Sequence, residues 1–244
     1  MTDTRFVLII PAYNEEATIE RVLGDVARVP LGCEIVVIDD GSVDATAAIA
    51  QRTGATVIRH PFNLGYGAAL QTGYKYALQV GASFLAQMDA DGQHDPLELT
   101  KLAEPILAGD CDLVVGSRFL EATDYQMGFF RSVAREFFRL LALLAGLRVS
   151  DPTSGLQVMN RTVLEVYASD FFPVDYPDVN VLLAVYRHGL SVEERSVSMS
   201  EAARKSTLHG GLRSLYYVYK MLLSTWSSAA ASRRRPKSGQ GDRP

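Results

Sequence analysis

The regular alternation of apolar runs and amphipathic stretches along residues 6–115 is the feature that most constrains the fold of this chain. Short apolar, β-branched runs that end at polar residues are typical of buried strands. We expect strands at residues 6–10, 34–38, 56–59, 84–88 and 113–115. We expect helices at residues 14–26, 43–52, 68–80 and 96–107, with Ser42 as N-cap of the second. Such alternation predicts an α/β fold with a mostly parallel, Rossmann-like sheet flanked by helices.

Polar residues follow four of the expected strands at the point where each strand ends. They are Pro11, Tyr13 and Glu15, then Asp39 and Asp40, then Asp89 and Asp91, and finally Gly116, Ser117 and Arg118. In open parallel sheets, ligands bind in the crevice outside the carboxyl ends of the strands. Because four polar clusters converge at that edge, we expect a binding site there and not an incidental acidic rim.

The acidic stretch after the fourth strand predicts a metal site. Residues two apart on an extended chain point to the same side, so Asp89 and Asp91 can both bind one hard cation. The carbonyl of Gln93 can supply a third oxygen. Oxygen ligands in an incomplete shell suit Mg²⁺ or Mn²⁺, which share their other positions with water and substrate phosphates. The alternative is an acidic loop that caps the helix beginning at Pro96.

Three further side chains indicate the kind of ligand. Carboxylates repel a bare diphosphate, so a metal ion would have to bridge the two. Arg118 can neutralise phosphate charge, Asp40 can accept from a base N–H or from ribose hydroxyls, and Tyr13 can stack on a ring. Each side chain also has an ordinary structural role open to it: Arg118 as a solvated charge, Asp40 as a turn residue and Tyr13 as an aromatic that packs on the core. The first strand is not followed by Gly-x-Gly-x-x-Gly and there is no Walker Lys-Ser/Thr, which disfavours ordinary dinucleotide and P-loop sites.

Composition and charge narrow the class of protein. The net charge of −4 argues against nucleic acid as the main partner. Cys33 and Cys111 lie beside apolar runs without metal-like spacing, so we expect reduced core thiols in a cytoplasmic protein. We expect neither a signal peptide nor a membrane span, because no basic leader is evident and no apolar stretch reaches about 18 residues.

Six motifs along the chain resemble glycosyltransferase family 2. They are Pro11-Ala-Tyr-Asn-Glu15, Ile38-Asp-Asp-Gly-Ser42, Asn63-Leu-Gly-Tyr-Gly67, Asp89-Ala-Asp-Gly-Gln-His94, Gly116-Ser-Arg118 and Asp151-Pro-Thr-Ser-Gly155. Within that family, the subgroup that these motifs most resemble is the dolichol-phosphate mannosyltransferase (polyprenyl-phosphate glycosyltransferase) group, over roughly residues 5–223. The resemblance implies the GT-A fold, a nucleotide-binding sheet with an acceptor region appended.

The resemblance also implies roles for individual residues. The nucleoside of a nucleotide sugar would be held by Pro11, Tyr13, Glu15, Ile38 and Asp40. Asp89, Ala90 and Asp91 would contact the donor, and Asp89, Asp91 and Gln93 would hold Mg²⁺ or Mn²⁺. Arg118 would bind the donor's phosphates or sugar. His94 is expected to be an ordinary loop residue.

The implied reaction is inverting, metal-dependent transfer of a sugar from GDP-mannose or a UDP-hexose to a polyprenyl or dolichyl phosphate. The metal and Arg118 would stabilise the leaving diphosphate. A phosphate monoester has a second pKa of about 6, so this acceptor needs positioning by cations more than a general base. A saccharide hydroxyl would instead need a carboxylate base, for which Asp151 and Asp178 are the candidates, although Asp151 equally suits a cap of the turn at 152–155.

The second half of the chain would handle the acceptor. A helix is expected at residues 129–147, with arginines every fourth residue, and Arg131 and Arg135 are the predicted ligands of the acceptor phosphate. This helix suits a membrane surface, or alternatively ordinary packing on the sheet. Helices are also expected at 160–168 and 179–188, and an extended segment at 191–199.

The C-terminal part departs from the family. Relatives carry Arg-x-x-Gly-x-Ser in a donor loop, whereas this chain has Ala202 and Lys205 at the Arg and Gly positions, so Arg204 and Lys205 are predicted to contact the donor instead. We expect one domain at 1–226, with a nucleotide-sugar-binding half at 1–120 and an acceptor-side half at 121–226. An apolar, aromatic helix near 212–226 and a disordered basic tail at 227–244 would attach the protein peripherally to the inner face of the membrane. The alternative is a core helix followed by a solvated basic tail.

Two other classes of protein fit parts of the pattern. A nucleotidyltransferase would also use a carboxylate-bound metal, but it should have a basic Gly-rich loop after the first strand, which Pro11-Ala-Tyr-Asn-Glu15 lacks. A catalytically weak nucleotide-sugar-binding protein is allowed by the altered loop at 202–207. A membrane-protein partner or a homo-oligomer is compatible with either class.

Overall fold

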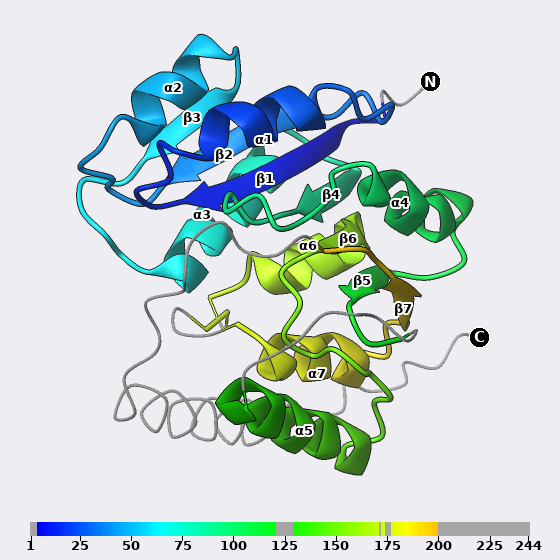
Figure 1. Ribbon diagram of the computed structural model, residues 1–244. Coiled ribbons are helices and arrows are strands. Elements are labelled where there is room, and N and C mark those ends of the chain that lie inside the picture. The colour runs from blue at the N-terminus through cyan, green and yellow to red at the C-terminus, as the bar shows by residue number, and fades with distance from the viewer. Residues whose placement is uncertain (1–3, 121–128, 171, 174–176, 200–244) are drawn as a thin grey trace.

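A computed structural model describes residues 4–120, 129–170, 172–173 and 177–199 (Figure 1). Its centre is a seven-stranded sheet with the strand order β3-β2-β1-β4-β6-β5-β7. The strands are β1 Phe6–Ala12, β2 Glu34–Asp39, β3 Thr56–Arg59, β4 Phe84–Gln87, β5 Leu113–Ser117, β6 Gln157–Asn160 and β7 Val192–Ser196. The five strands expected from the alternating pattern are therefore all present.

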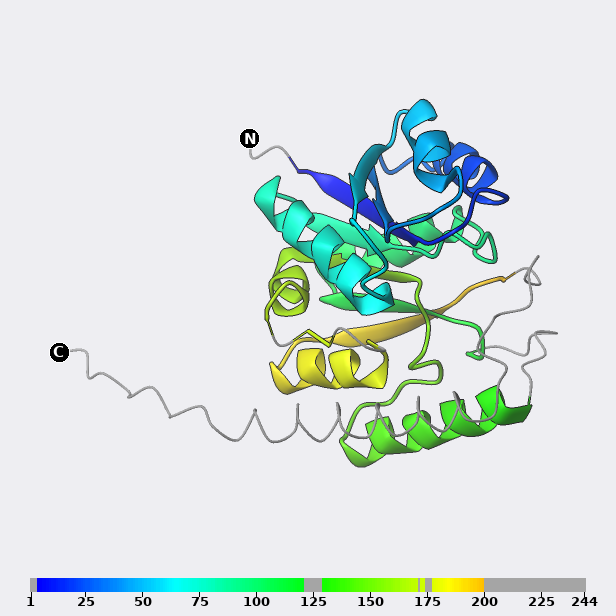
Figure 2. The same ribbon diagram turned by 90° about the vertical axis from the view of Figure 1, so that its left-hand side faces the viewer.

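Helices cover both faces of the sheet (Figures 1 and 2). They are α1 Ile19–Val26, α2 Thr46–Arg52, α3 Tyr66–Gln79, α4 Glu98–Ala108, α5 Phe129–Leu144, α6 Arg161–Tyr167 and α7 Val179–Arg187. The apolar sides of α1, α2 and α4 pack on one face of the sheet, and those of α3, α5, α6 and α7 belong to the core on the other face. Within the described ranges, no helix is both long and apolar enough to cross a membrane.

The sheet is parallel except at one strand. β1, β2, β3 and β4 form parallel pairs, as the alternating pattern predicts. β5 pairs in parallel with β7, which lies in the segment expected only to be extended. β6 lies antiparallel between β4 and β5, and we did not expect a strand there. The segment Gln157–Asn160 is too short to show a strand pattern in the sequence. It is a strand because it pairs with two neighbouring strands: Val158 pairs with Ala86 of β4 on one side and with Val114 of β5 on the other. Asn160, expected within a helix, is instead the N-cap of α6, where its side chain accepts from the N–H of Val163 at 3.1 Å.

The first two helices begin later than expected, because side chains of the two preceding loops bind each other. Asn14, at φ 56°, donates its N–H to Ser42 Oγ at 2.9 Å, and Glu16 donates its N–H to Asp44 Oδ2 at 3.2 Å. In return, Ala45 donates its N–H to Glu16 Oε2 at 3.0 Å. Ser42 is therefore a link between loops, and its prediction as the N-cap of α2 is wrong. The cross-links fix the strand ends of β1 and β2 relative to each other.

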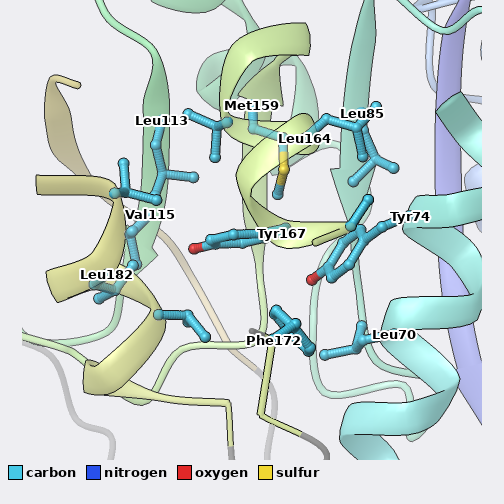
Figure 3. Close-up of a cluster of buried hydrophobic side chains, with 14 of the residues drawn as sticks. Leu70, Tyr74, Leu85, Leu113, Val115, Met159, Leu164, Tyr167, Phe172 and Leu182 are labelled. Atoms are coloured by element: carbon cyan, nitrogen blue, oxygen red, sulfur yellow. The ribbon is translucent and has the colours of Figure 1, made fainter. Parts of the chain in front are cut away.

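An aromatic cluster joins the two halves of the sheet on the α3 side (Figure 3). The ring of Tyr74 in α3 lies 5.3 Å from that of Tyr167 in α6 and 5.2 Å from that of Phe172, centroid to centroid. The Tyr74 hydroxyl donates to the side-chain carbonyl of Gln87 at the end of β4, and Gln87 Nε2 donates to the carbonyl of Gly155 at 3.1 Å. The core thus places the loop containing Gly155 against the end of β4.

Candidate active site

The loop after β4 brings two of the predicted metal ligands together. The N–H of Gln93 donates to Asp91 Oδ1 at 3.0 Å, and the Gln93 side-chain amide donates to Asp91 Oδ2. Burial, and then the negative charge of Asp89, raise the pKa of the Asp91 carboxyl above its ordinary value. The charge on Asp89 therefore acts on Asp91, as expected of two carboxylates at one strand end. Both side chains are half-buried.

Asp89 is held by Tyr66 from α3 and by His94 from its own loop. The hydroxyl of Tyr66, the first residue of α3, donates to Asp89 Oδ1 at 2.8 Å. Nε2 of His94 lies 3.7 Å from Asp89 Oδ2. Burial alone would raise the pKa of the Asp89 carboxyl, but the adjacent His94 ring, followed by the hydrogen bond from the Tyr66 hydroxyl, brings that pKa below its ordinary value. Asp89 is thus kept as an anion.

These residues suit a hard divalent ion. Among the described residues, no three His, Cys, Asp or Glu side chains are grouped as a metal-ligand set. The set that converges is two carboxylates with the amide of Gln93, all of which can offer oxygen. Such a set leaves coordination positions for water and phosphate oxygens, which is how Mg²⁺ is usually held. Mg²⁺ or Mn²⁺ at Asp89, Asp91 and Gln93 stays a prediction that the donor chemistry fits.

Arg118 and Asp151 form a buried ion pair. Arg118 Nε lies 2.6 Å from Asp151 Oδ2 and Nη2 lies 2.7 Å from Oδ1, with side-chain exposures of 13% and 0%. The pair is held further by Glu194 of β7, whose Oε1 accepts the N–H of Asp151 at 2.9 Å. The bidentate geometry orients the Arg118 guanidinium at the end of β5. Asp151, predicted as either a base or a turn cap, is here the partner of Arg118.

A second arginine approaches Arg118 from α5. The guanidinium carbon of Arg135 lies 3.9 Å from the ring centroid of Phe119, and that of Arg118 lies 5.5 Å from the same centroid. Cation–π contacts of this kind hold guanidinium groups over aromatic faces. Phe119 therefore links two of the residues predicted to bind phosphate groups. Arg131 lies within α5, but its side chain is outside the part of the chain that the structure describes.

The residues predicted to hold the nucleoside surround the ends of β1 and β2. Tyr13 is 46% exposed at the end of β1, so a face of its ring is accessible for stacking. Pro11 and Ile38 are buried and can contribute only their backbone to a ligand. Glu15 is half-buried, and its Oε2 accepts from Thr18 Oγ1 at 3.0 Å. The same Thr18 hydroxyl lies 2.9 Å from the carbonyl oxygen of Ala90, so its one hydrogen is shared between the nucleoside side and the acidic loop.

Asp40 is engaged with the protein itself. It is 3% exposed, and its Oδ1 lies 2.7 Å from Nδ1 of His60 and accepts the N–H of Leu64 at 2.9 Å. Its Oδ2 accepts the N–H of Gly65 at 2.9 Å. The structure therefore gives Asp40 a role in holding the loop before α3, and a contact with a base stays a prediction.

The neighbouring residue Asp39 was expected at the same strand end, but without a role of its own. It is fully buried, and its Oδ2 lies 3.0 Å from Nε of Arg59. A cavity of about 650 Å³ opens beside this pair, lined by Gly41, Ser42, Val43, Arg59, His60 and Pro61. This cavity lies beside the ends of β2 and β3, where the nucleoside is predicted to bind.

The sequence did not predict three neighbours of Asp89. His94 was expected to be an ordinary loop residue, but its side chain is only 4% exposed and faces Asp89. Tyr66 belonged to a motif without an assigned role, and a Cβ on Gly155 would lie 2.6 Å from Asp89 Oδ2. All three residues belong to motifs shared with the family, but no pattern in the sequence indicated that they contact Asp89.

The chain beyond β7 is also anchored beside the acidic loop. Met199 forms an antiparallel bridge with His94, and the N–H of Ser198 donates to Glu98 Oε1 at 3.1 Å. Arg204 and Lys205, predicted to contact the donor, lie outside the described residues, as does the tail at 227–244. Asp178 lies at the N-terminus of α7, and its charge is one of those that raise the pKa of the Tyr66 hydroxyl, after burial and Asp89.

Solved structures share this arrangement of the sheet and its helices. Glucosyl-3-phosphoglycerate synthase from Mycobacterium tuberculosis, in complex with phosphoglyceric acid, matches with a TM-score of 0.69 over 97% of this chain and 82% of that one, at 23% identity. The same enzyme in complex with Mn²⁺, UDP and glucosyl-3-phosphoglycerate matches with a TM-score of 0.67. The fold is the GT-A fold of nucleotide-sugar-dependent glycosyltransferases, as the motifs implied.

The sequence comparisons place the chain within that class. The model of the family described as Glycosyl transferase family 2 matches residues 7–168, and the chain belongs to this family. Polyprenol monophosphomannose synthase of Mycolicibacterium smegmatis is 31% identical over 81% of this chain and 78% of that protein. UDP-N-acetylglucosamine–dolichyl-phosphate N-acetylglucosaminyltransferase of Methanococcus voltae is 32% identical over 68% and 73%. The protein is a glycosyltransferase of the dolichol-phosphate mannosyltransferase-like subgroup, and the nucleotidyltransferase alternative is set aside.

Proposed function

We propose that this glycosyltransferase transfers a sugar from a nucleoside-diphosphate sugar to a polyprenyl phosphate, with a divalent ion held by Asp89, Asp91 and Gln93. The observation that carries the proposal is that the acidic loop and the Arg118–Asp151 pair lie at one edge of the sheet, where the charge of Arg118 acts on Asp89. A carboxylate-bound ion neutralises the diphosphate, and a guanidinium nearby stabilises the charge that develops as the diphosphate leaves. The relatives named above act on polyprenyl or dolichyl phosphates.

The donor would lie with its nucleoside over β1 and β2. The accessible ring of Tyr13 and the cavity beside Asp39 and Arg59 support this placement. Pro11, Glu15, Ile38 and Asp40 shape the same edge. Ala90 follows Asp89 directly, so its backbone would pass the diphosphate. From Met199, which is bridged to His94, an extended chain of five to six residues spans up to about 20 Å, which lets Arg204 and Lys205 reach the donor.

The acceptor phosphate would bind at Arg131 and Arg135 of α5, and the ring of Phe119 links Arg135 to Arg118, which would bind the donor's diphosphate. Arg118 and Arg135 both lie over this ring, and Arg131 is one helical turn before Arg135. A phosphate dianion needs cations there and no proton acceptor. Because Asp151 is fully buried in its pair with Arg118, it is poorly placed to act as a base. These contacts favour a phosphate acceptor over a hydroxyl.

A saccharide hydroxyl acceptor is the second candidate. It would require a carboxylate base near the donor, and Asp178 is the residue whose position favours it, because its charge acts on the Tyr66 hydroxyl beside Asp89. Replacement by Asn distinguishes the two acceptors. We expect Asp178→Asn to retain turnover within about threefold for a phosphate acceptor, and to lose about 100-fold or more if Asp178 were a general base.

A polyprenyl phosphate is a membrane lipid, so an enzyme that uses it as acceptor has to reach a lipid surface. The outward stripe of α5 carries Val133, Leu140, Leu143 and Leu144, which are 47–77% exposed. Phe138 and Ala142, on the opposite side of the helix, are fully buried. A helix that exposes an apolar stripe on one side and is packed on the other suits peripheral binding at the inner face of a membrane.

The test of the function is a thermal-shift panel followed by a transfer assay. GDP-mannose, UDP-glucose and UDP-N-acetylglucosamine are each added with and without Mn²⁺, and the donor that raises Tm most is then incubated, radiolabelled, with polyprenyl phosphate. We expect Mn²⁺-dependent stabilisation by one donor and labelled lipid product. Asp89→Ala and Asp91→Ala should abolish product formation, and near-wild-type turnover in either variant would refute the metal assignment. Binding without turnover would identify a nucleotide-sugar-binding protein instead.

A further inference from the structure

The motif Asn63-Leu-Gly-Tyr-Gly67 has no part in the donor or acceptor contacts described above. Its loop is nevertheless fixed tightly. The carboxylate of Asp40 accepts the N–H groups of Leu64 and Gly65, each at 2.9 Å. On the other side, a Cβ on Gly41 would lie 2.4 Å from the carbonyl carbon of Phe62, so the two backbones are in direct contact. A loop held at both points has little freedom to move.

The fixed loop ends at a residue that contacts the acidic site. Gly65 has φ 99°, a conformation that glycine adopts readily, and the chain turns there directly into α3. Tyr66 is consequently the first residue of α3, and its hydroxyl donates to Asp89 Oδ1 at 2.8 Å. The position of this hydroxyl is set by the loop and by α3, whose Ala69 and Leu70 are buried in the core. Asp40 and Asp89, which follow the different strands β2 and β4, are linked through it.

We propose that Tyr66 is a positioning residue for metal binding: its hydroxyl fixes the orientation of the Asp89 carboxylate so that a divalent ion meets an ordered ligand. The inference rests on the proposed function. Hydrogen-bonded partners of a metal ligand orient it and reduce the entropy lost when the ion binds. An oxygen of a carboxylate can accept from the hydroxyl and still offer a lone pair to a metal.

Asp89 is supported on its other oxygen as well. Nε2 of His94 lies 3.7 Å from Oδ2, a distance too long for a firm hydrogen bond. The Tyr66 hydroxyl is thus the shorter of the two contacts. Because Tyr66 comes from α3 while His94 follows Asp89 in the same loop, the tyrosine ties the acidic loop to the rigid part of the fold.

The matched experiment compares two tyrosines of α3. Tyr66→Phe removes the hydroxyl that contacts Asp89. Tyr76→Phe removes a hydroxyl that donates to Glu34 Oε1 at 2.6 Å, away from the site, and serves as the control. Mn²⁺ affinity is measured for each purified full-length protein by calorimetric titration at saturating nucleoside diphosphate. The kcat and the apparent KM for Mn²⁺ are measured with the donor that the thermal-shift panel selects.

We expect Tyr66→Phe to weaken Mn²⁺ binding about tenfold, the lower end of the range for second partners of metal ligands. Its apparent KM for Mn²⁺ should rise by a similar factor, with kcat at saturating Mn²⁺ within about threefold of wild type, whereas Tyr76→Phe should leave the Mn²⁺ affinity unchanged. An unchanged Mn²⁺ affinity in a folded Tyr66→Phe protein would overturn the role of Tyr66 alone. If the wild-type protein binds no Mn²⁺ with any nucleoside diphosphate, the metal-dependent function itself fails.

Discussion

At the scale of single residues, the site depends on how closely the chain approaches Asp89. Gly155 belongs to the loop after Asp151, and a Cβ there would lie 2.6 Å from Asp89 Oδ2. That distance is shorter than real contacts allow, so any side chain at this position would push the carboxylate aside. The glycine is required for space beside the predicted metal ligand.

Replacement of Gly155 by alanine should therefore impair catalysis more than folding. We expect turnover to fall about 10- to 100-fold, because a displacement near 1 Å in a reacting site has effects of that size. Gly24→Ala, inside α1 with nothing within 4 Å of its Cβ, is the control: it should stabilise by about 0.5–1 kcal/mol at unchanged turnover. Steady-state assays and urea unfolding measure both. Full activity in Gly155→Ala would show that Asp89 can shift without consequence.

At the scale of elements, α5 differs from the other helices because it has an exposed apolar stripe. Periodicity predicted the helix and its interleaved arginines, and α5 does run from Phe129 to Leu144. The spacing of apolar residues could not decide which side of the helix packs on the rest of the protein. The packing of Phe138 and Ala142 turns the side with Leu140 and Leu144 outward.

This stripe gives a direct test of membrane attachment. Leu140→Glu combined with Leu144→Glu should reduce co-sedimentation with anionic vesicles by tenfold or more, since burying each leucine contributes about 1.5–3 kcal/mol. Leu107→Glu, at a leucine of α4 that is 49% exposed, is the matched control and should co-sediment like wild type. If the double variant co-sedimented as strongly as wild type, the apolar stripe of α5 would not be the membrane contact. Circular dichroism confirms that each variant is folded.

At the scale of the whole molecule, strands from the expected nucleotide-sugar-binding half and from the expected acceptor-side half pair within one sheet. β5 ends at Ser117, within the expected nucleotide-sugar-binding half at 1–120. Yet both of its neighbours, β6 and β7, come from later in the chain. The strand that carries Arg118 at its end is thus positioned entirely by the second half.

A fragment of residues 1–120 should therefore fail to fold on its own. Without β6 and β7, β5 has no partner strand, and the edge of β4 is left unpaired. We expect the fragment to lack a cooperative thermal transition by circular dichroism, while the full chain unfolds in one. A cooperative melt of the fragment would establish residues 1–120 as an independent unit.

The amino-acid sequence alone determined the strands β1 to β5, the acidic loop at Asp89 and Asp91, and the family, because strand periodicity and short motifs are local properties of the chain. The tertiary structure alone decided that β6 enters antiparallel, that Asp151 pairs with Arg118, and that Tyr66 contacts Asp89. These are contacts between residues far apart in sequence. They depend on which faces the folded core brings together, and no local pattern specifies that.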